Sequence, residues 1–414
     1  MSTTITGSFI FVLCLFFTAL TARAADVSLN LSTALQVALR ENPALKARRH
    51  ALGIAQARAQ QAGLLFQNNP RFSVELETPM SGGSGTSVEF NLLQELEIAG
   101  QRGYRYEAAA KNLAQARLSV EEAERVLRLE VVQAFYNLLA NQQIIADLRE
   151  VLAGQENLLQ AGQKRFARED ISILELNTLR LDHDQVRNEL ANKRRDRVSL
   201  EKQLRLLAGL QDEGSLTATG DLLDISPKSS AVADRAALQS CILANHPDLK
   251  AAKLAVEVRE AELRLAQARR IPNVALGPRY KRDNNQNFIG GEIAVPLPFF
   301  NRNQEEITTA LANRNVSRAE LDGRMLTAKQ EVDSAYKEID VTKERLSGYQ
   351  TDYLGDIGKT MALTRKAYES GEMTILEFSV TRDRLAQTRL RYLDAALGHL
   401  QAVAELEAQA PSCF

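Results

Sequence analysis

The strongest constraint on the fold is a seven-residue spacing of apolar residues that occurs in two distant stretches of the chain. The first stretch has apolar residues at Val131, Leu138, Ile145, Leu152, Leu159 and Phe166, and the second at Met325, Val332, Ile339, Leu346 and Tyr353. A seven-residue period predicts helices that wind around a neighbour with one apolar seam. Aligning Glu130 with Glu331 brings the two patterns into register, so the sequence predicts a duplicated structural unit.

The positions of the prolines leave room for long helices. Residues 80–226 and 299–410 contain no proline. A proline in a helix interior costs roughly 3 kcal/mol, because it removes a hydrogen bond and clashes with the preceding turn. We therefore expect two long helical hairpins, over residues 101–208 and 303–408, each with one unbroken helix on either side of its turn.

Short alternating segments precede each predicted hairpin. Apolar and polar residues alternate with period two, which predicts strands at about 71–78, 87–96, 273–280 and 288–297. A Gly/Ser-rich loop follows the first strand, and a polar loop (KRDNNQN) follows the third. The expected fold class is therefore mainly α with a small β part, built from a unit of helix, β-hairpin and long helical hairpin that occurs twice.

The amino-terminal segment has the features of a secretory signal. The uncharged apolar run 9–20 is followed by Ala22-Arg23-Ala24 and is shorter than the about 20 residues that a membrane-spanning helix needs. The predicted organisation is a signal peptide at 1–24, a first repeat at 25–208, a linker at 209–232, a second repeat at 233–410 and a tail at 411–414.

Composition argues against several classes of function. The formal net charge is −1, so no overall basic field indicates nucleic-acid binding. The four histidines form no metal-ligand spacing with one another or with cysteines, so we expect no bound metal and no cofactor. No catalytic motif stands out. After removal of the signal peptide two cysteines remain, Cys241 and Cys413, and the sequence does not decide whether they pair.

The four predicted strands have the length needed to cross an outer membrane at a tilt. A bilayer allows no open sheet edge, and closed barrels have about eight strands or more, so lipid-facing strands here require several chains that share one barrel. The apolar faces would then contact lipid, and the lumen would be lined by Glu75, Glu77, Glu89 and Glu292. The alternative is a soluble sheet with one face on a core.

Five segments resemble one known family. They are QAGLLFQNNP (61–70), LLQELEIAGQRG (92–103), FAREDISILEL (166–176), IAVPLPFFNRNQEEI (293–307) and YESGEMTILEF (368–378). The segments are similar to those of the TolC-type outer-membrane efflux proteins, and in particular to the cobalt–zinc–cadmium branch of the heavy-metal resistance–nodulation–division (RND) systems. The resemblance covers essentially all of the mature chain.

This resemblance implies a homotrimer in the outer membrane with a long periplasmic portion. Three chains would form a twelve-stranded β-barrel that is continued by a periplasmic α-helical barrel, and the partners would be a periplasmic adaptor and an inner-membrane RND pump. The residues expected at the adaptor-docking tips are Glu169, Asp170, Ile171, Gly371, Glu372 and Met373. Glu377, with Glu175 as its counterpart in the first repeat, would form an acidic periplasmic gate. The first turn lacks the family's glycine, and Met373 replaces a basic latch residue.

The expected function is a passive exit duct for heavy-metal cations, without enzymatic activity. One alternative is a duct of the same fold that serves drug efflux or type I protein secretion. The other belongs to a different class and is a soluble periplasmic coiled-coil adaptor or scaffold. Adaptors also carry helical hairpins, but typically one per chain beside a lipoyl-like β domain, and no such domain is evident.

Overall fold

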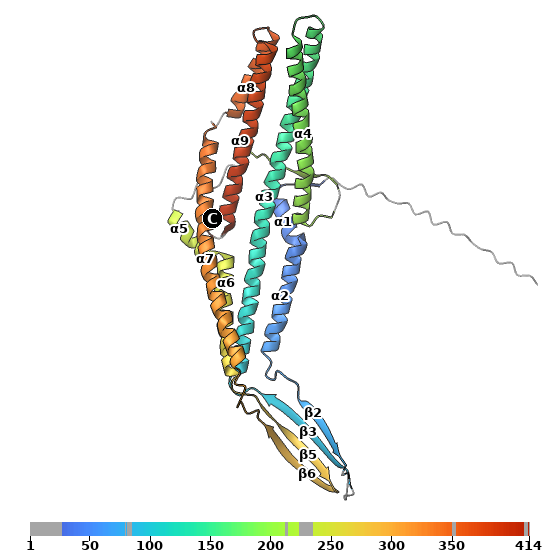
Figure 1. The fold of residues 1–414 in the computed structure, drawn as a ribbon, viewed down its shortest axis with the longest axis vertical. Coiled ribbons are helices and arrows are strands. Elements are labelled where there is room, and N and C mark those ends of the chain that lie inside the picture. The colour runs from blue at the N-terminus through green and yellow to red at the C-terminus, as the bar shows by residue number, and fades with distance from the viewer. Residues whose placement is uncertain are drawn as a thin grey trace, which may run out of the picture.

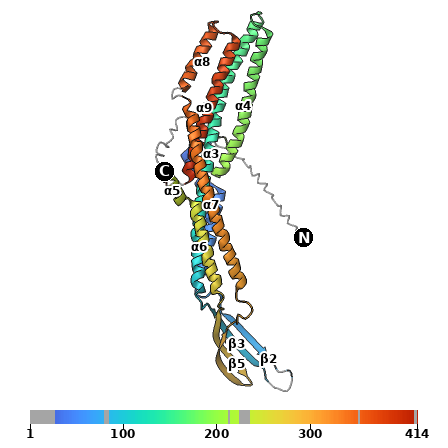
Figure 2. The same ribbon diagram turned by 60° about the vertical axis from the view of Figure 1, so that its left-hand side comes forward.

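The fold is taken from a computed structural model that describes residues 27–78, 80, 85–211, 214–222, 235–349, 353–409 and 413. The predicted signal peptide, part of the Gly/Ser-rich loop, part of the linker and most of the tail lie outside the described residues. The molecule is elongated, with a β-sheet at one end and the turns of two helical hairpins at the other (Figure 1, Figure 2).

The first repeat contains three strands and four helices. They are β1 (Val27–Leu29), α1 (Leu31–Glu41), α2 (Pro43–Ala62), β2 (Arg71–Glu77), β3 (Ser87–Leu96), α3 (Gln101–Phe166) and α4 (Ile173–Ala208). At about 1.5 Å per residue, a helix as long as α3 extends roughly 100 Å. Local signals fix the helix ends: Asn30 forms a capping box with Thr33 ahead of α1, and Gly209 ends α4 in the left-handed conformation.

The chain after α4 has the same order of elements with one interruption, and the first of them lies in the predicted linker. They are β4 (Leu216–Ala218), α5 (Arg235–Asn245), α6 (Pro247–Ala268), β5 (Val274–Asp283), β6 (Gln286–Ala294), α7 (Gln304–Ser347), α8 (Tyr353–Glu369) and α9 (Ile375–Gln409). The prediction of a single helix before the second turn is wrong, because this part of the hairpin consists of two helices, α7 and α8. The break follows Ser347 and Gly348, two residues with weak helix propensity.

The second β-hairpin also differs from its predicted bounds. β5 and β6 continue through most of the predicted loop to a turn at Asn284 and Asn285, whose φ angles are 45° and 63°. Asparagine tolerates positive φ, and two such residues favour a tight hairpin turn. At the other end β6 stops at Ala294 instead of reaching residue 297, because Pro296 and Pro298 cannot donate to a strand ladder.

The strands of both repeats form one sheet. Its order is β2-β3-β5-β6, every neighbouring pair is antiparallel, and β3 joins β5 across the two repeats. Among the described strands, β2 and β6 each have one side without a paired neighbour. The sheet is therefore open at both edges within a single chain.

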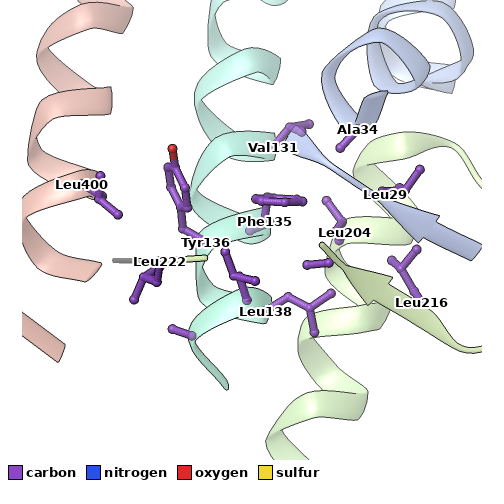
Figure 3. Packing of buried hydrophobic residues seen from close by; sticks show 14 of the residues in the cluster. Leu29, Ala34, Val131, Phe135, Tyr136, Leu138, Leu204, Leu216, Leu222 and Leu400 are labelled. Carbon is purple, nitrogen blue, oxygen red and sulfur yellow. The ribbon is translucent and has the colours of Figure 1, made fainter. Parts of the chain in front are cut away.

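The main hydrophobic core lies about halfway along the helices. It includes a second, smaller sheet that the sequence did not predict. β1 pairs in parallel with β4, a strand inside the predicted linker. Leu29 and Leu216 from these strands pack with Val131, Phe135 and other residues of α3 and with Leu204 of α4 (Figure 3). The small sheet therefore ties the start of the first repeat to the segment that leads into the second.

A second core cluster packs α5 against α7 and α9, around Ile242, Val332 and Leu406. Beside it Cys241 and Cys413 form a disulfide, with a Cα–Cα distance of 6.1 Å. The sequence had left this pairing open. Among the described helices, none combines the length and apolar character of a membrane span.

Candidate channel wall and hairpin tips

The sheet has two chemically different faces. Residues directly opposite each other on neighbouring strands share a face, and the register pairs Glu75 with Glu89, Glu77 with Ser87 and Glu89 with Lys281. Glu292 lies opposite Gly277 of β5. Gly277 and Lys281 are four residues apart on this strand, so they share a face, and Glu292 lies on that face too. The structure thus brings the four acids that we predicted from sequence onto one surface.

The opposite face of the sheet is apolar and uncovered. In the single chain Leu76 is 69% and Ile289 87% exposed. The other large apolar side chains on this face that are also exposed are Phe72, Val74, Phe90, Leu92, Leu276 and Ile293. A continuous exposed apolar face that includes residues of every strand indicates a surface that contacts lipid or protein.

Three basic residues on the charged face, Arg71, Arg279 and Lys281, were not predicted to lie there. Arg279 donates a hydrogen bond of 2.6 Å to Glu89, and Lys281 lies 3.8 Å from Glu77. Glu75 and Glu292 are close enough to act electrostatically on Arg279. The expected acidic lining is therefore a mixed one, because Arg279 and Lys281 lie among all four acids. The signal was present in the alternation of GPRYKRD, which we had partly assigned to a loop.

The first hairpin turn connects α3 to α4 through Glu169, Asp170 and Ile171. Glu169 adopts a left-handed conformation with φ of 63°, a conformation that disfavours residues other than glycine. Ser172 then caps α4: its backbone N–H and its hydroxyl donate to Glu175 Oε2 at 2.8 and 3.0 Å. These hydrogen bonds, the backbone one first, lower the pKa of Glu175.

The second turn has the same construction with glycine in the strained position. Gly371 has φ of 80° and precedes Glu372 and Met373. The backbone N–H and the hydroxyl of Thr374 donate to Glu377 Oε2 at 2.9 and 2.8 Å, which lowers the pKa of Glu377. Both predicted gate residues therefore act as the third-residue partner of a helix capping box, a structural role in addition to the predicted one.

Both turns lie at the end of the molecule farthest from the sheet (Figure 1). Close to them, a small apolar cluster joins the two hairpins. Leu158 of α3 and Leu179 of α4 pack with Ile375 and Phe378 of α9, and Met373 lies against them. The acidic residues of the tips, Glu169, Asp170 and Glu372, are exposed. The tip residues thus form one end surface, far from the charged face of the sheet.

Within the described part of the chain, no group of three or more His, Cys, Asp or Glu side chains could hold a metal ion. The charged face of the sheet, the apolar face and the two tips are therefore the features from which a function has to be inferred.

Comparison with known proteins agrees with this geometry. Residues 34–210 and 238–410 match the family described as outer membrane efflux protein. This chain belongs to that family. The outer membrane efflux proteins are transport proteins, so the predicted fold class, outer-membrane location and non-enzymatic transport function are confirmed, and the soluble adaptor alternative is wrong.

Individual relatives of this outer membrane efflux protein are distant but extend over most of its length. The cobalt-zinc-cadmium resistance protein CzcC of Cupriavidus metallidurans is 24% identical over 379 residues, which cover 90% of this chain and 87% of CzcC. The cation efflux system protein CusC of Escherichia coli K12 is 24% identical over 82% of this chain and 77% of its own. The fold matches a crystal structure of CusC with a TM-score of 0.75 at 20% identity, over 92% of both chains.

Proposed function

We propose that this protein is the outer-membrane exit duct of an RND-type tripartite efflux system and that it exports heavy-metal cations. The observation that carries the proposal is the sheet, which has an uncovered apolar face, a charged opposite face and two unpaired edges. Such a sheet fits a shared barrel with lipid outside and water inside. The transport would be passive, driven by a pump in the inner membrane.

The assembled form we propose is a homotrimer. Each chain supplies four strands, and β6 of one chain would pair with β2 of the next until the barrel closes with twelve. The helical hairpins would continue the barrel into the periplasm as a helical tunnel. This arrangement satisfies the backbone groups of both sheet edges, which a single chain leaves unpaired.

The tips would contact the other members of the system. Glu169, Asp170, Ile171, Gly371, Glu372 and Met373 form an exposed or half-exposed end surface and would meet a periplasmic adaptor. Glu377 and Glu175 would form the acidic gate at the periplasmic entrance, because carboxylates repeated around a threefold axis attract cations. Capping does not exclude this role, since a capping carboxylate keeps its charge.

The cargo proposal rests on the relatives. CzcC carries cobalt, zinc and cadmium resistance in its name, and CusC is named a cation efflux system protein. The mixed lining of Arg279 and Lys281 among the acids suggests that the duct itself selects weakly. Cargo selection would then lie mainly with the pump.

Adjacent substitutions on the two faces of β2 test the shared barrel. Val74 is 47% exposed on the apolar face, and Ser73 is its neighbour on the charged face. A lipid-facing arginine near the bilayer midplane costs about 2–4 kcal/mol. We expect Val74→Arg to abolish the heat-modifiable oligomer in outer-membrane fractions, whereas Ser73→Arg retains it. A monomer that dissolves without detergent would contradict the proposal.

The amount of metal that cells accumulate tests whether the protein exports heavy-metal cations. Cells that lack their own cation exporters would express the protein together with the adaptor and pump of a cation-exporting RND system. We expect intracellular cobalt, zinc or cadmium to fall relative to cells that express the adaptor and pump alone. Unchanged metal with reduced accumulation of a hydrophobic drug would favour the drug-efflux alternative instead.

A further inference from the structure

A cavity of about 530 Å³ lies between α3, α8 and α9, near the hairpin tips and away from the sheet. This size lies within the range of roughly 300–1,000 Å³ that is usual for small-molecule sites. Most of its wall is apolar and includes Leu148, Val151, Leu158, Met361, Phe378 and Leu385. The capping boxes and the tip surface described above do not account for it.

One residue of the wall is a buried arginine without a hydrogen-bond acceptor. Arg382 of α9 is 5% exposed, and its three guanidinium nitrogens have no partner among the described residues. Two carboxylates act on it electrostatically: Asp182 of α4, which accepts a hydrogen bond from Ser379, and Asp383 of α9. Buried guanidinium groups normally carry paired hydrogen bonds, because an unsatisfied charge costs several kcal/mol.

The other charged residues of the wall are equal in number and opposite in sign, so they add no net charge to that of Arg382. Arg365 and Arg389 also belong to the wall, against the two acids Asp147 and Glu150. Arg389 forms an ion pair of 2.7 Å with Asp147. The cavity thus combines an extended apolar surface with a positive charge that has no hydrogen-bonded counterion, and this combination complements an organic anion.

We propose that this cavity binds an organic anion with an apolar body, such as an aryl or alkyl carboxylate or sulfonate, whose acidic group accepts hydrogen bonds from Arg382. The guanidinium nitrogens of Arg382 are covered by neighbouring atoms, so the guanidinium would turn about its side-chain torsions to meet the ligand. The bound anion contacts α3, α8 and α9 together and holds the first hairpin against the second. The proposal does not depend on the cargo or on the partner proteins.

Equilibrium dialysis of the full-length oligomer in a non-ionic detergent tests this site. The probe is 2-naphthalenesulfonate, and 2-naphthalenemethanol is its uncharged counterpart of similar shape. We expect saturable binding of one sulfonate per chain, with the alcohol at least about tenfold weaker, as hydrogen bonds to a charged group predict. Equal binding of the two probes would mark simple partition into apolar space and would overturn the proposal.

Two substitutions on the same helix sharpen the result. Arg382→Gln should weaken sulfonate binding about tenfold or more, whereas Arg391→Gln, an exposed arginine outside the cavity wall, should leave it unchanged. If Arg382→Gln does not assemble, Arg382→Lys keeps the charge but loses the planar fork, and it should bind with intermediate affinity. Full affinity in the glutamine variant would overturn the assignment of Arg382. Either failure would leave the proposed duct function untouched.

Discussion

Arg279 reaches across from β5 to Glu89 on β3, and the 2.6 Å hydrogen bond between them is central to the charged face of the sheet. Lys281, the residue directly opposite Glu89, lies 3.8 Å from Glu77 and adds a second positive charge. The proposed lumen therefore alternates in sign, instead of presenting the acidic surface that the glutamates alone suggested. This arrangement leads to the first prediction.

Arg279→Gln should make the reconstituted channel more cation-selective. The substitution removes one positive charge per chain from the charged face and leaves Glu89 without its ion-pair partner, although Asn91 still donates to it. Reversal potentials in a salt gradient across a planar bilayer measure the change. Arg282→Gln is the matched control, because Arg282 lies opposite Val88 on the apolar face. Equal reversal potentials for both variants would count against a lumen lined by Arg279.

Glutamine and alanine at position 377 separate the gate role from the capping role. Glutamine retains the oxygen that caps α9 but not the charge, whereas alanine loses both. If Glu377 gates by its charge, Glu377→Gln should relieve block by multivalent cations as strongly as Glu377→Ala does. Single-channel recording with the cation on the periplasmic side measures the block. Block that persists in Glu377→Gln would leave Glu377 a capping residue only.

Acid should loosen the first turns of α4 and α9. The pKa values of Glu175 and Glu377 are lowered by hydrogen bonds from Ser172 and Thr374. A lowered folded-state pKa means that the stabilisation is present above the ordinary value near 4.5 and is lost as the pH falls through the lower folded value. The protection factors of these turns, which correct for the intrinsic pH dependence of amide exchange, should fall below about pH 4.5. In Glu175→Gln and Glu377→Gln the same turns should show no such dependence.

The two turns should respond oppositely to substitution at their left-handed positions. Glu169→Gly removes a conformational penalty of about 1–2 kcal/mol, offset in part by the flexibility of glycine in the unfolded chain. It should therefore stabilise the first tip by up to about 1 kcal/mol. Gly371→Ala should destabilise the second tip by about 1 kcal/mol. Local hydrogen exchange reports both, and Glu372→Ala, outside the positive-φ region, serves as the control.

Loss of the disulfide should weaken the whole second repeat. Cys241 and Cys413 are separated by 172 residues, and closing so long a loop is expected to stabilise a protein by about 2–4 kcal/mol. Cys241→Ser should lower the free energy of unfolding by that amount in denaturant titrations. Reductant should destabilise the unmodified protein equally and have no further effect on the variant. If reductant also destabilised Cys241→Ser, its effect on the unmodified protein could not be assigned to this disulfide.

The sequence carried the duplicated helical architecture because its signals were long and regular. Val131 and Leu138, two members of the seven-residue pattern, are fully buried, and so is Val332 in the second repeat. The break between α7 and α8 escaped prediction because the same pattern continues across it from Leu346 to Tyr353. A period reports which face is apolar and does not report whether the backbone is continuous.

Short elements were predicted less accurately than the long helices. β1 and β4 have three residues each, too few for alternation to be recognised, and they form only by pairing with each other. The turn at Asn284 and Asn285 was assigned to a loop, and Lys281 was therefore assigned to that loop and not to a strand. The capping roles of Glu175 and Glu377 follow from a local sequence pattern, a Ser or Thr three residues before a Glu, which Ser172 and Thr374 supply. The charge of the two glutamates alone does not indicate this role.

The two unpaired edges of the sheet also bear on how the protein reaches its site of action. A lone chain that entered hydrocarbon would expose the backbone of β2 and β6, so the edges oppose insertion until other copies are at hand. In the proposed shared barrel, insertion and assembly would be one event, and its rate should rise more steeply than linearly with the concentration of chains in the periplasm. A given reduction in expression would therefore lower the rate of insertion by a larger factor than it lowers the amount of protein made.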